Sequence, residues 1–81
     1  MAEIELFGTA SCAFTREMRE WLEWSGREFV EYDVEIDAEA RRRLRALVGT
    51  VQTVPVLMED GQIVQIGWQG RGCIVHLRSD G

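Results

Sequence analysis

Cys12 is the residue of this sequence best placed to do covalent chemistry. It lies in FGTASCAFTREM (residues 7–18), after a short apolar run and before a stretch with helical spacing. A thiolate attacks disulfides, whereas an unperturbed thiol with a pKa of about 8.5 is mostly protonated at neutral pH. The positive end of a helix, the Thr15 hydroxyl and the Arg16 charge all favour the anion. We therefore expect a nucleophile whose pKa lies below that of free cysteine; the alternative is a small, inert core residue.

The spacing of apolar residues predicts the elements that must hold Cys12 in place. Alternation indicates strands, and recurrence every three to four residues indicates helices. Gly26 and Gly49 are typical helix ends, Asp37 is a typical helix start, and Asp60-Gly61 predicts a hairpin turn. The expected elements are a strand at 3–7, a helix at 13–25, a strand at 29–36, a helix at 38–48, strands at 54–58 and 63–66, and a two-turn helix at 72–78.

This element order, βαβαββα, predicts an α/β fold. A βαβ unit followed by a hairpin implies a mixed four-stranded sheet with helices on both faces. The chain has 81 residues, which is enough for one small domain and too few for two. We therefore expect a single domain at residues 1–81, and we expect it to be a monomer.

Composition and charge exclude several classes of protein. Apolar residues make up 46% and charged residues 28% of the chain, as in an ordinary soluble fold. No apolar run is long enough to span a membrane, and residues 1–7 carry acids where a signal peptide carries bases. A formal net charge of −5 argues against binding to nucleic acid. We therefore expect a cytoplasmic protein with neither a membrane nor a nucleic-acid partner.

The count of metal-ligating residues argues against a metal centre. Two cysteines with 60 residues between them, together with a single histidine, cannot assemble a four-ligand zinc site within one chain. Two cysteines are also too few for a disulfide scaffold. We expect that no metal is required.

Pro55 begins an otherwise good strand, although a proline cannot donate to the ladder of a sheet. In one interpretation the Val54-Pro55 bond is trans, the commoner state, and Pro55 only marks the start of the strand. In the other, the bond is cis and turns the backbone of Val54 outward, so that its N–H and C=O are free to pair with an extended peptide ligand. The second interpretation requires that Cys12 lie nearby.

Three short motifs, each at a junction between expected elements, resemble those of glutaredoxins. They are Cys12-Ala13-Phe14-Thr15 before the first helix, Thr53-Val54-Pro55 before the third strand, and the glycine-rich stretch 67–72 before the last helix. The resemblance covers nearly the whole chain. It implies a thioredoxin-like fold, a cis bond before Pro55, thiol-disulfide oxidoreductase activity, and glutathione as the usual ligand.

The same resemblance implies roles for single residues. Cys12 would be the nucleophile, Thr53 and Val54 would flank the bound tripeptide, and the region from Gly67 to Gly72 would hold its γ-glutamyl end. Phe14 stands at an aromatic position of the family motif, where it covers the sulfur or belongs to the core face of the helix. Trp68 either stacks against a ligand or anchors its loop, and Gly70 and Gly72 are either turn residues or a backbone nest for a carboxylate.

Thr15 stands where dithiol relatives carry a second cysteine. A threonine cannot resolve a mixed disulfide, so the resemblance predicts a monothiol enzyme in which Cys12 exchanges with glutathione or a protein thiol. Cys12-Ala13-Phe14-Thr15 also resembles the motif of cluster-binding monothiol glutaredoxins, which makes an iron–sulfur carrier using Cys12 and glutathione one alternative. A non-catalytic redox sensor or adaptor with the same fold is another.

Cys73 is the second cysteine, and it follows Gly72 at the expected start of the last helix. In a thioredoxin-like arrangement that helix begins on the same side of the sheet as Cys12. Cys73 is then either a small core residue beside Ile74 and Val75 or a resolving thiol for Cys12. Direct pairing requires that the two Cα atoms lie within about 7 Å of each other.

Overall fold

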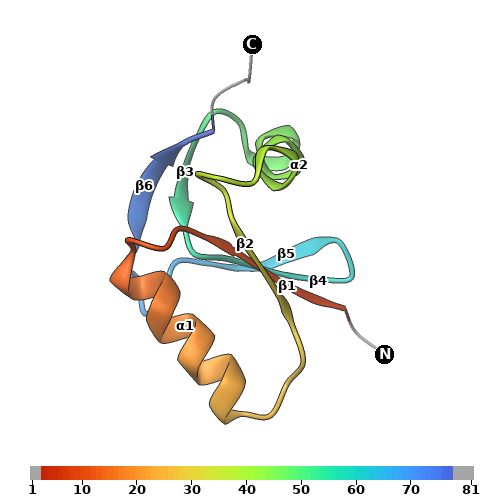
Figure 1. Cartoon of the computed structure of the whole chain (residues 1–81), viewed down its shortest axis with the longest axis vertical. Helices are drawn as coiled ribbons and strands as arrows, with labels where there is room; N and C mark the ends of the chain where they lie inside the picture. The colour runs from red at the N-terminus through yellow and green to blue at the C-terminus, as the bar shows by residue number, and fades with distance from the viewer. Residues whose placement is uncertain (1–2, 78–81) are drawn as a thin grey trace.

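A computed structural model describes residues 3–77 of the chain as a central sheet with a helix on either side (Figure 1). The elements in chain order are β1 (Ile4–Gly8), α1 (Ala13–Trp24), β2 (Val30–Asp33), α2 (Ala38–Val48), β3 (Val51–Val54), β4 (Val56–Glu59), β5 (Gln62–Ile66) and β6 (Cys73–His76). None of the helices in residues 3–77 is long and apolar enough to cross a membrane.

The main sheet has four strands in the order β2-β1-β4-β5. Strands β1 and β2 are parallel because α1 connects them, whereas β4 pairs antiparallel with both β1 and β5. The predicted mixed four-stranded sheet is confirmed, with β2 at one edge. The strand expected at 29–36 is shorter than predicted, because the chain turns after Asp33.

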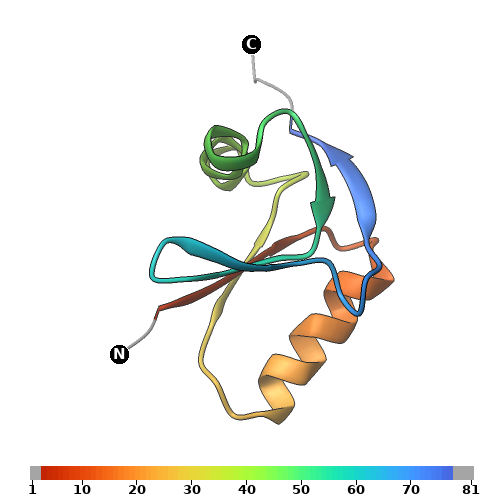
Figure 2. The same cartoon turned by 180° about the vertical axis from the view of Figure 1, so that it is seen from behind.

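The two helices cover opposite faces of this sheet, as Figures 1 and 2 show from the two sides. Alternate residues of β1 point to opposite faces, so each face receives its own apolar cluster. Towards α1 the buried residues are Ile4, Leu6, Met18, Leu22 and Leu57. Towards α2 they include Phe7, Ala40, Leu44, Val56 and Met58.

Local sequence accounts for the helix ends and for the hairpin. The carboxylate of Asp37 accepts a hydrogen bond from the Ala40 amide at 3.0 Å, which caps the first turn of α2. Asp60 and Gly61 join β4 to β5 with φ angles of 53° and 80°. Two successive positive φ angles match the twist of the flanking strands, which is why Asp-Gly predicted this turn.

The helix predicted at 72–78 is wrong. Residues 73–76 form strand β6, which pairs antiparallel with β3 in a separate two-stranded sheet; residue 78 lies outside the described residues. The β-branched Ile74 and Val75 favour a strand, with Ile74 exposed and Val75 buried. The strand expected at 54–58 is also divided, since β3 ends and β4 begins on either side of Pro55.

Candidate active site

Cys12 is the residue that immediately precedes α1. Its backbone is extended, with φ −88° and ψ 116°, and its carbonyl accepts the first hydrogen bond of the helix from the Arg16 amide at 3.2 Å. Its own amide donates to the Thr9 carbonyl at 3.2 Å, which fixes the loop after β1. The residue is only 2% exposed. The helix start therefore lies where the sequence predicted it, and Cys12 stands at the positive end of the helix dipole.

Cys12 and Cys73 are joined by a disulfide, with their Cα atoms 6.1 Å apart. No free cysteine remains in residues 3–77, which contain both cysteines of the chain. Of the two alternatives for Cys73, the structure supports the one in which its sulfur lies beside that of Cys12, but the helix expected to bring it there is wrong. Cys73 reaches Cys12 as the first residue of strand β6, not as the first residue of a helix.

The Val54-Pro55 peptide bond is cis, as the resemblance implied. The carbonyl oxygen of Val54 lies 4.0 Å from the sulfur of Cys12, so this turn and the start of α1 meet. Val54 pairs in register with Cys73 across the antiparallel ladder of β3 and β6. The expectation that the Val54 backbone is free for a ligand is therefore incorrect in this disulfide form, because β6 lies along that edge.

Gly72 packs closely against β3. A Cβ atom at this position would overlap the methyl group of Thr53 and the carbonyl oxygen of Val54. The other two glycines of this loop, Gly67 and Gly70, have φ angles of 83° and 77° and are turn residues. A Cβ at Gly67 would also overlap the carbonyl oxygen of Arg71, so Gly67 and Gly72 both allow a close approach, whereas Gly70 is needed for its φ angle alone.

Thr15 is completely buried in the first turn of α1. Its hydroxyl has no hydrogen-bond partner. A Cβ at Gly8 would overlap the Thr15 side chain, so the end of β1 and the first turn of α1 are in tight contact. A buried hydroxyl without a partner is costly, and this one stands three residues after Cys12.

Two aromatic residues of the predicted site take part in packing. Phe14 is partly buried against the apolar cluster that contains Cys12. Trp68 packs against the α1-side cluster and its ring lies 5.7 Å from that of Trp21, tilted by 50°. The structure thus supports the core position for Phe14 and the loop-anchor interpretation for Trp68.

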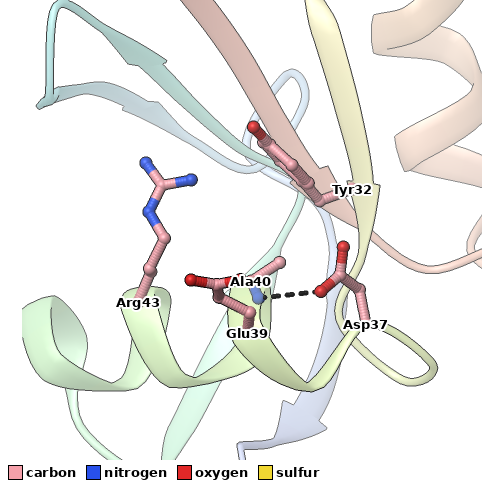
Figure 3. A pocket seen from close by; sticks show the side chains of 5 residues that line it. All are labelled: Tyr32, Asp37, Glu39, Ala40 and Arg43. Atoms are coloured by element: carbon pink, nitrogen blue, oxygen red, sulfur yellow. Dashed lines mark hydrogen bonds between the residues drawn. The ribbon is translucent and has the colours of Figure 1, made fainter.

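A polar pocket of about 250 Å³ lies apart from the cysteines, between β2 and α2 (Figure 3). It is lined by Tyr32, Asp37, Glu39, Ala40 and Arg43. The Arg43 guanidinium donates to the buried carboxylate of Glu5 at 2.9–3.0 Å, a hydrogen bond that raises the pKa of Arg43. Tyr32 also donates to Glu5, at 3.1 Å. The Arg43 charge beside this pocket therefore neutralises a carboxylate inside the fold.

No three metal-ligating side chains gather in the part of the chain that the structure describes.

The chain matches the family model described as Glutaredoxin over residues 4–64. The chain belongs to the glutaredoxin family. Glutaredoxins are thiol-disulfide oxidoreductases that generally use glutathione, so this protein is an oxidoreductase of that class. No curated protein matches the chain. The matched residues include Cys12, Thr15 and the Val54-Pro55 turn, whereas Cys73 and β6 lie beyond them.

Glutathione does not fit along β3 in the disulfide form of this glutaredoxin. Gly72 leaves no room even for a methyl group against Thr53 and Val54, and Cys73 already occupies the position opposite Val54. The loop at 67–72 also carries no acidic residue to pair with an amino group. A thiol peptide would have to displace the chain's own residues from this edge.

Proposed function

We propose that this glutaredoxin reduces disulfides with two thiols, Cys12 as the attacking thiol and Cys73 as the resolving thiol. The observation that carries the proposal is the Cys12–Cys73 disulfide, with a Cα–Cα distance of 6.1 Å. That distance lies within the range of about 4.4 to 6.8 Å at which disulfides form without movement of the backbone. The substrate is a disulfide of glutathione or of a protein.

In the first step, the Cys12 thiolate attacks one sulfur of the substrate disulfide. A bond forms between Cys12 and that sulfur, the substrate S–S bond breaks, and the second substrate sulfur leaves as a thiolate that takes up a proton. The position of Cys12 before α1 supports its role, because the free amides and the dipole of the helix favour a thiolate there. Cys73 begins a strand and has no such stabilisation.

In the second step, the Cys73 thiolate attacks the sulfur of Cys12. The Cys12–Cys73 bond forms, and the remaining substrate sulfur leaves as a thiolate that is then protonated. Over both steps the substrate gains two electrons and two protons, and the two cysteines lose them. An external thiol reductant returns the enzyme to its dithiol form.

This mechanism differs from the monothiol route suggested by Thr15. Thr15 occupies the position of the usual second cysteine, but β6 brings a thiol to Cys12 from the far end of the chain. The absence of a cysteine at position 15 therefore does not remove internal resolution.

The test is to follow adducts and free thiols in the wild type, Cys73→Ser and Cys12→Ser proteins after incubation with oxidised glutathione. By mass spectrometry, C73S is expected to retain one glutathione on Cys12 and to release it at least tenfold more slowly than the wild type. C12S is expected to form no adduct and no internal disulfide. After mild oxidation, the wild-type monomer is expected to have no free thiols; two free thiols, or only intermolecular dimers, would contradict the proposal.

A further inference from the structure

Strand β6 occupies the edge that one interpretation of Val54-Pro55 left free for an extended ligand. Four residue pairs connect it to β3 in antiparallel register, from Val51 opposite His76 to Val54 opposite Cys73. At the Cys73 end it also carries the sulfur that is bonded to Cys12. An extended peptide bound to Cys12 through a disulfide needs the same two contacts, a ladder along β3 and a sulfur at Cys12.

We infer that residues 72–74 form a flap that closes the ligand edge beside Val54 when Cys12 and Cys73 are joined, and that this flap must open before a ligand can pair there. The inference rests on the two-thiol function proposed above and concerns access to its site: the family resemblance implies that a cysteine-containing ligand pairs beside Val54, and residues 72–74 control whether it can. The edge beside Val54 then holds either the substrate cysteine or Cys73, never both. Resolution is the return of residues 72–74 to this edge, which expels the substrate.

The packing at Gly72 supports mutual exclusion. Any side chain at this position would overlap Thr53 and Val54, so the closed strand leaves no space between itself and β3. A substrate backbone can pair with this edge only after residues 72–74 have moved away. Glycine at position 72 in turn allows these residues to return.

The rest of β6 is anchored, so the movement is confined to its first residues. Val75 and Leu77 are buried in the α2-side cluster, and the Leu77 amide donates to the Thr50 carbonyl at 2.6 Å. Ile74 is 64% exposed and its release exposes little new apolar surface. The preceding loop contains three residues with positive φ angles, Gly67, Gln69 and Gly70. A β-bridge between Trp68 and Arg71 closes this loop. Residues 72–74 are thus a short flap between two fixed points.

The chemistry of the exchange follows from this geometry. The reduced enzyme opens at residues 72–74, and the Cys12 thiolate displaces one sulfur from a peptide disulfide while that peptide pairs with β3. Cys73 then attacks the sulfur of Cys12. The new Cys12–Cys73 bond replaces the disulfide to the peptide, and the pairing of residues 72–74 with β3 replaces the pairing of the peptide with β3. The leaving thiolate takes a proton from water.

The first experiment traps the open state in the Cys73→Ser protein. Its Cys12 is converted into a mixed disulfide with glutathione, into one with a capped pentapeptide that has cysteine at its centre, or into a methylthio adduct that has no peptide backbone. Backbone amide shifts are then recorded by NMR. With at least one of the two peptide adducts, we expect the amide shifts of residues 72–74 to move to random-coil values while those of residues 75–77 stay unchanged. With the methylthio adduct, we expect the shifts of both segments to stay unchanged. Which peptide does so identifies glutathione or a protein segment as the source.

The outcomes separate this inference from the function on which it rests. Failure of Cys12 to form any adduct would contradict the proposed function itself. Adducts that form while residues 72–74 keep their closed shifts would contradict the inference alone, because the substrate would then lie elsewhere. Release of residues 75–77 as well would contradict the anchored flap.

The second experiment uses Gly72→Ala. Its control is Gly61→Ala, a substitution in the remote β4–β5 hairpin turn, where an added Cβ meets no atom within 4 Å. Rapid-quench mass spectrometry separates adduct formation on Cys12 from closure of the Cys12–Cys73 bond. We expect G72A to slow closure at least tenfold without slowing adduct formation, and G61A to change neither rate. Equal slowing of both steps by G72A would overturn the inference.

Discussion

The two sheets of this glutaredoxin are held together in different ways. The four-stranded sheet is covered on both faces by helices and buries one apolar cluster on each side. The β3–β6 sheet has only two strands, an arrangement that is marginally stable on its own, and a disulfide closes one of its ends. One part of the fold therefore depends on apolar burial in every redox state, whereas the other depends partly on a bond that the proposed reaction makes and breaks.

The largest expected effect is that of the disulfide. The bond closes a loop with a sequence separation of 61, and a loop of that size stabilises a folded protein by about 4 kcal/mol through the entropy of the unfolded chain. We expect the free energy of unfolding of the oxidised wild type to exceed that of the reduced wild type by about this amount. Guanidinium unfolding followed by circular dichroism measures both values. Reduced Cys73→Ser is expected to match the reduced wild type within about 1 kcal/mol. A difference below about 1 kcal/mol between the two wild-type forms would remove the contrast between the sheets.

The next effect is that of a core residue far from β6. Leu22 is fully buried between α1 and the main sheet, so Leu22→Ala is expected to lower the free energy of unfolding by about 3 kcal/mol. The loss is expected to be the same in oxidised and reduced protein, because the cysteines belong to the other cluster. Leu47→Ala, at a residue that is more than half exposed, provides the control and should cost well below about 1 kcal/mol. A loss at Leu22 that depends on redox state would show that the two regions are coupled.

The smallest effect concerns Thr15, which lies at the boundary between the two regions. Its buried hydroxyl has no partner in the disulfide form, so Thr15→Val is expected to stabilise the oxidised protein by about 1 kcal/mol. In the reduced protein the hydroxyl can donate to the Cys12 thiolate, and its loss is then expected to raise the pKa of that thiol. Thiolate absorbance against pH in a Cys73→Ser background measures the change. An unchanged pKa would mean that the helix end alone sets the acidity of Cys12.

Local rules were sufficient to predict the main sheet and its helices. The bounds of α2 follow from Asp37 and Gly49, and the β4–β5 turn follows from Asp60-Gly61, because a cap or a tight turn depends on a few neighbouring residues. Strand β6 could not be found in this way. Its partner, Val51–Val54, precedes it by about twenty residues, and only this long-range pairing makes a strand of Cys73–His76. The adjacent Ile74 and Val75 were the available local indication.

The same division applies to the site. Cys12 could be predicted because a cysteine between a strand and a helix has a local reason to be acidic. The pairing with Cys73 depends on the path of residues 67–72, which sequence does not specify. Gly70 and Gly72 are identical in type, yet one is needed for its φ angle and the other for its contact with β3. Only the folded backbone distinguishes these two needs.

The disulfide also determines how the molecule would respond to tension. A pulling force applied through Glu3 and Leu77 crosses from Cys12 to Cys73 directly in the oxidised chain, because these cysteines lie near opposite ends of the described residues. Both helices and the strands from β2 to β5 then lie inside a covalent loop that carries no load. Once the bond is reduced, the enclosed segment adds roughly 200 Å to the extensible length. Each turn of the proposed two-thiol cycle would therefore switch the chain between a short, inextensible tether and a long, extensible one.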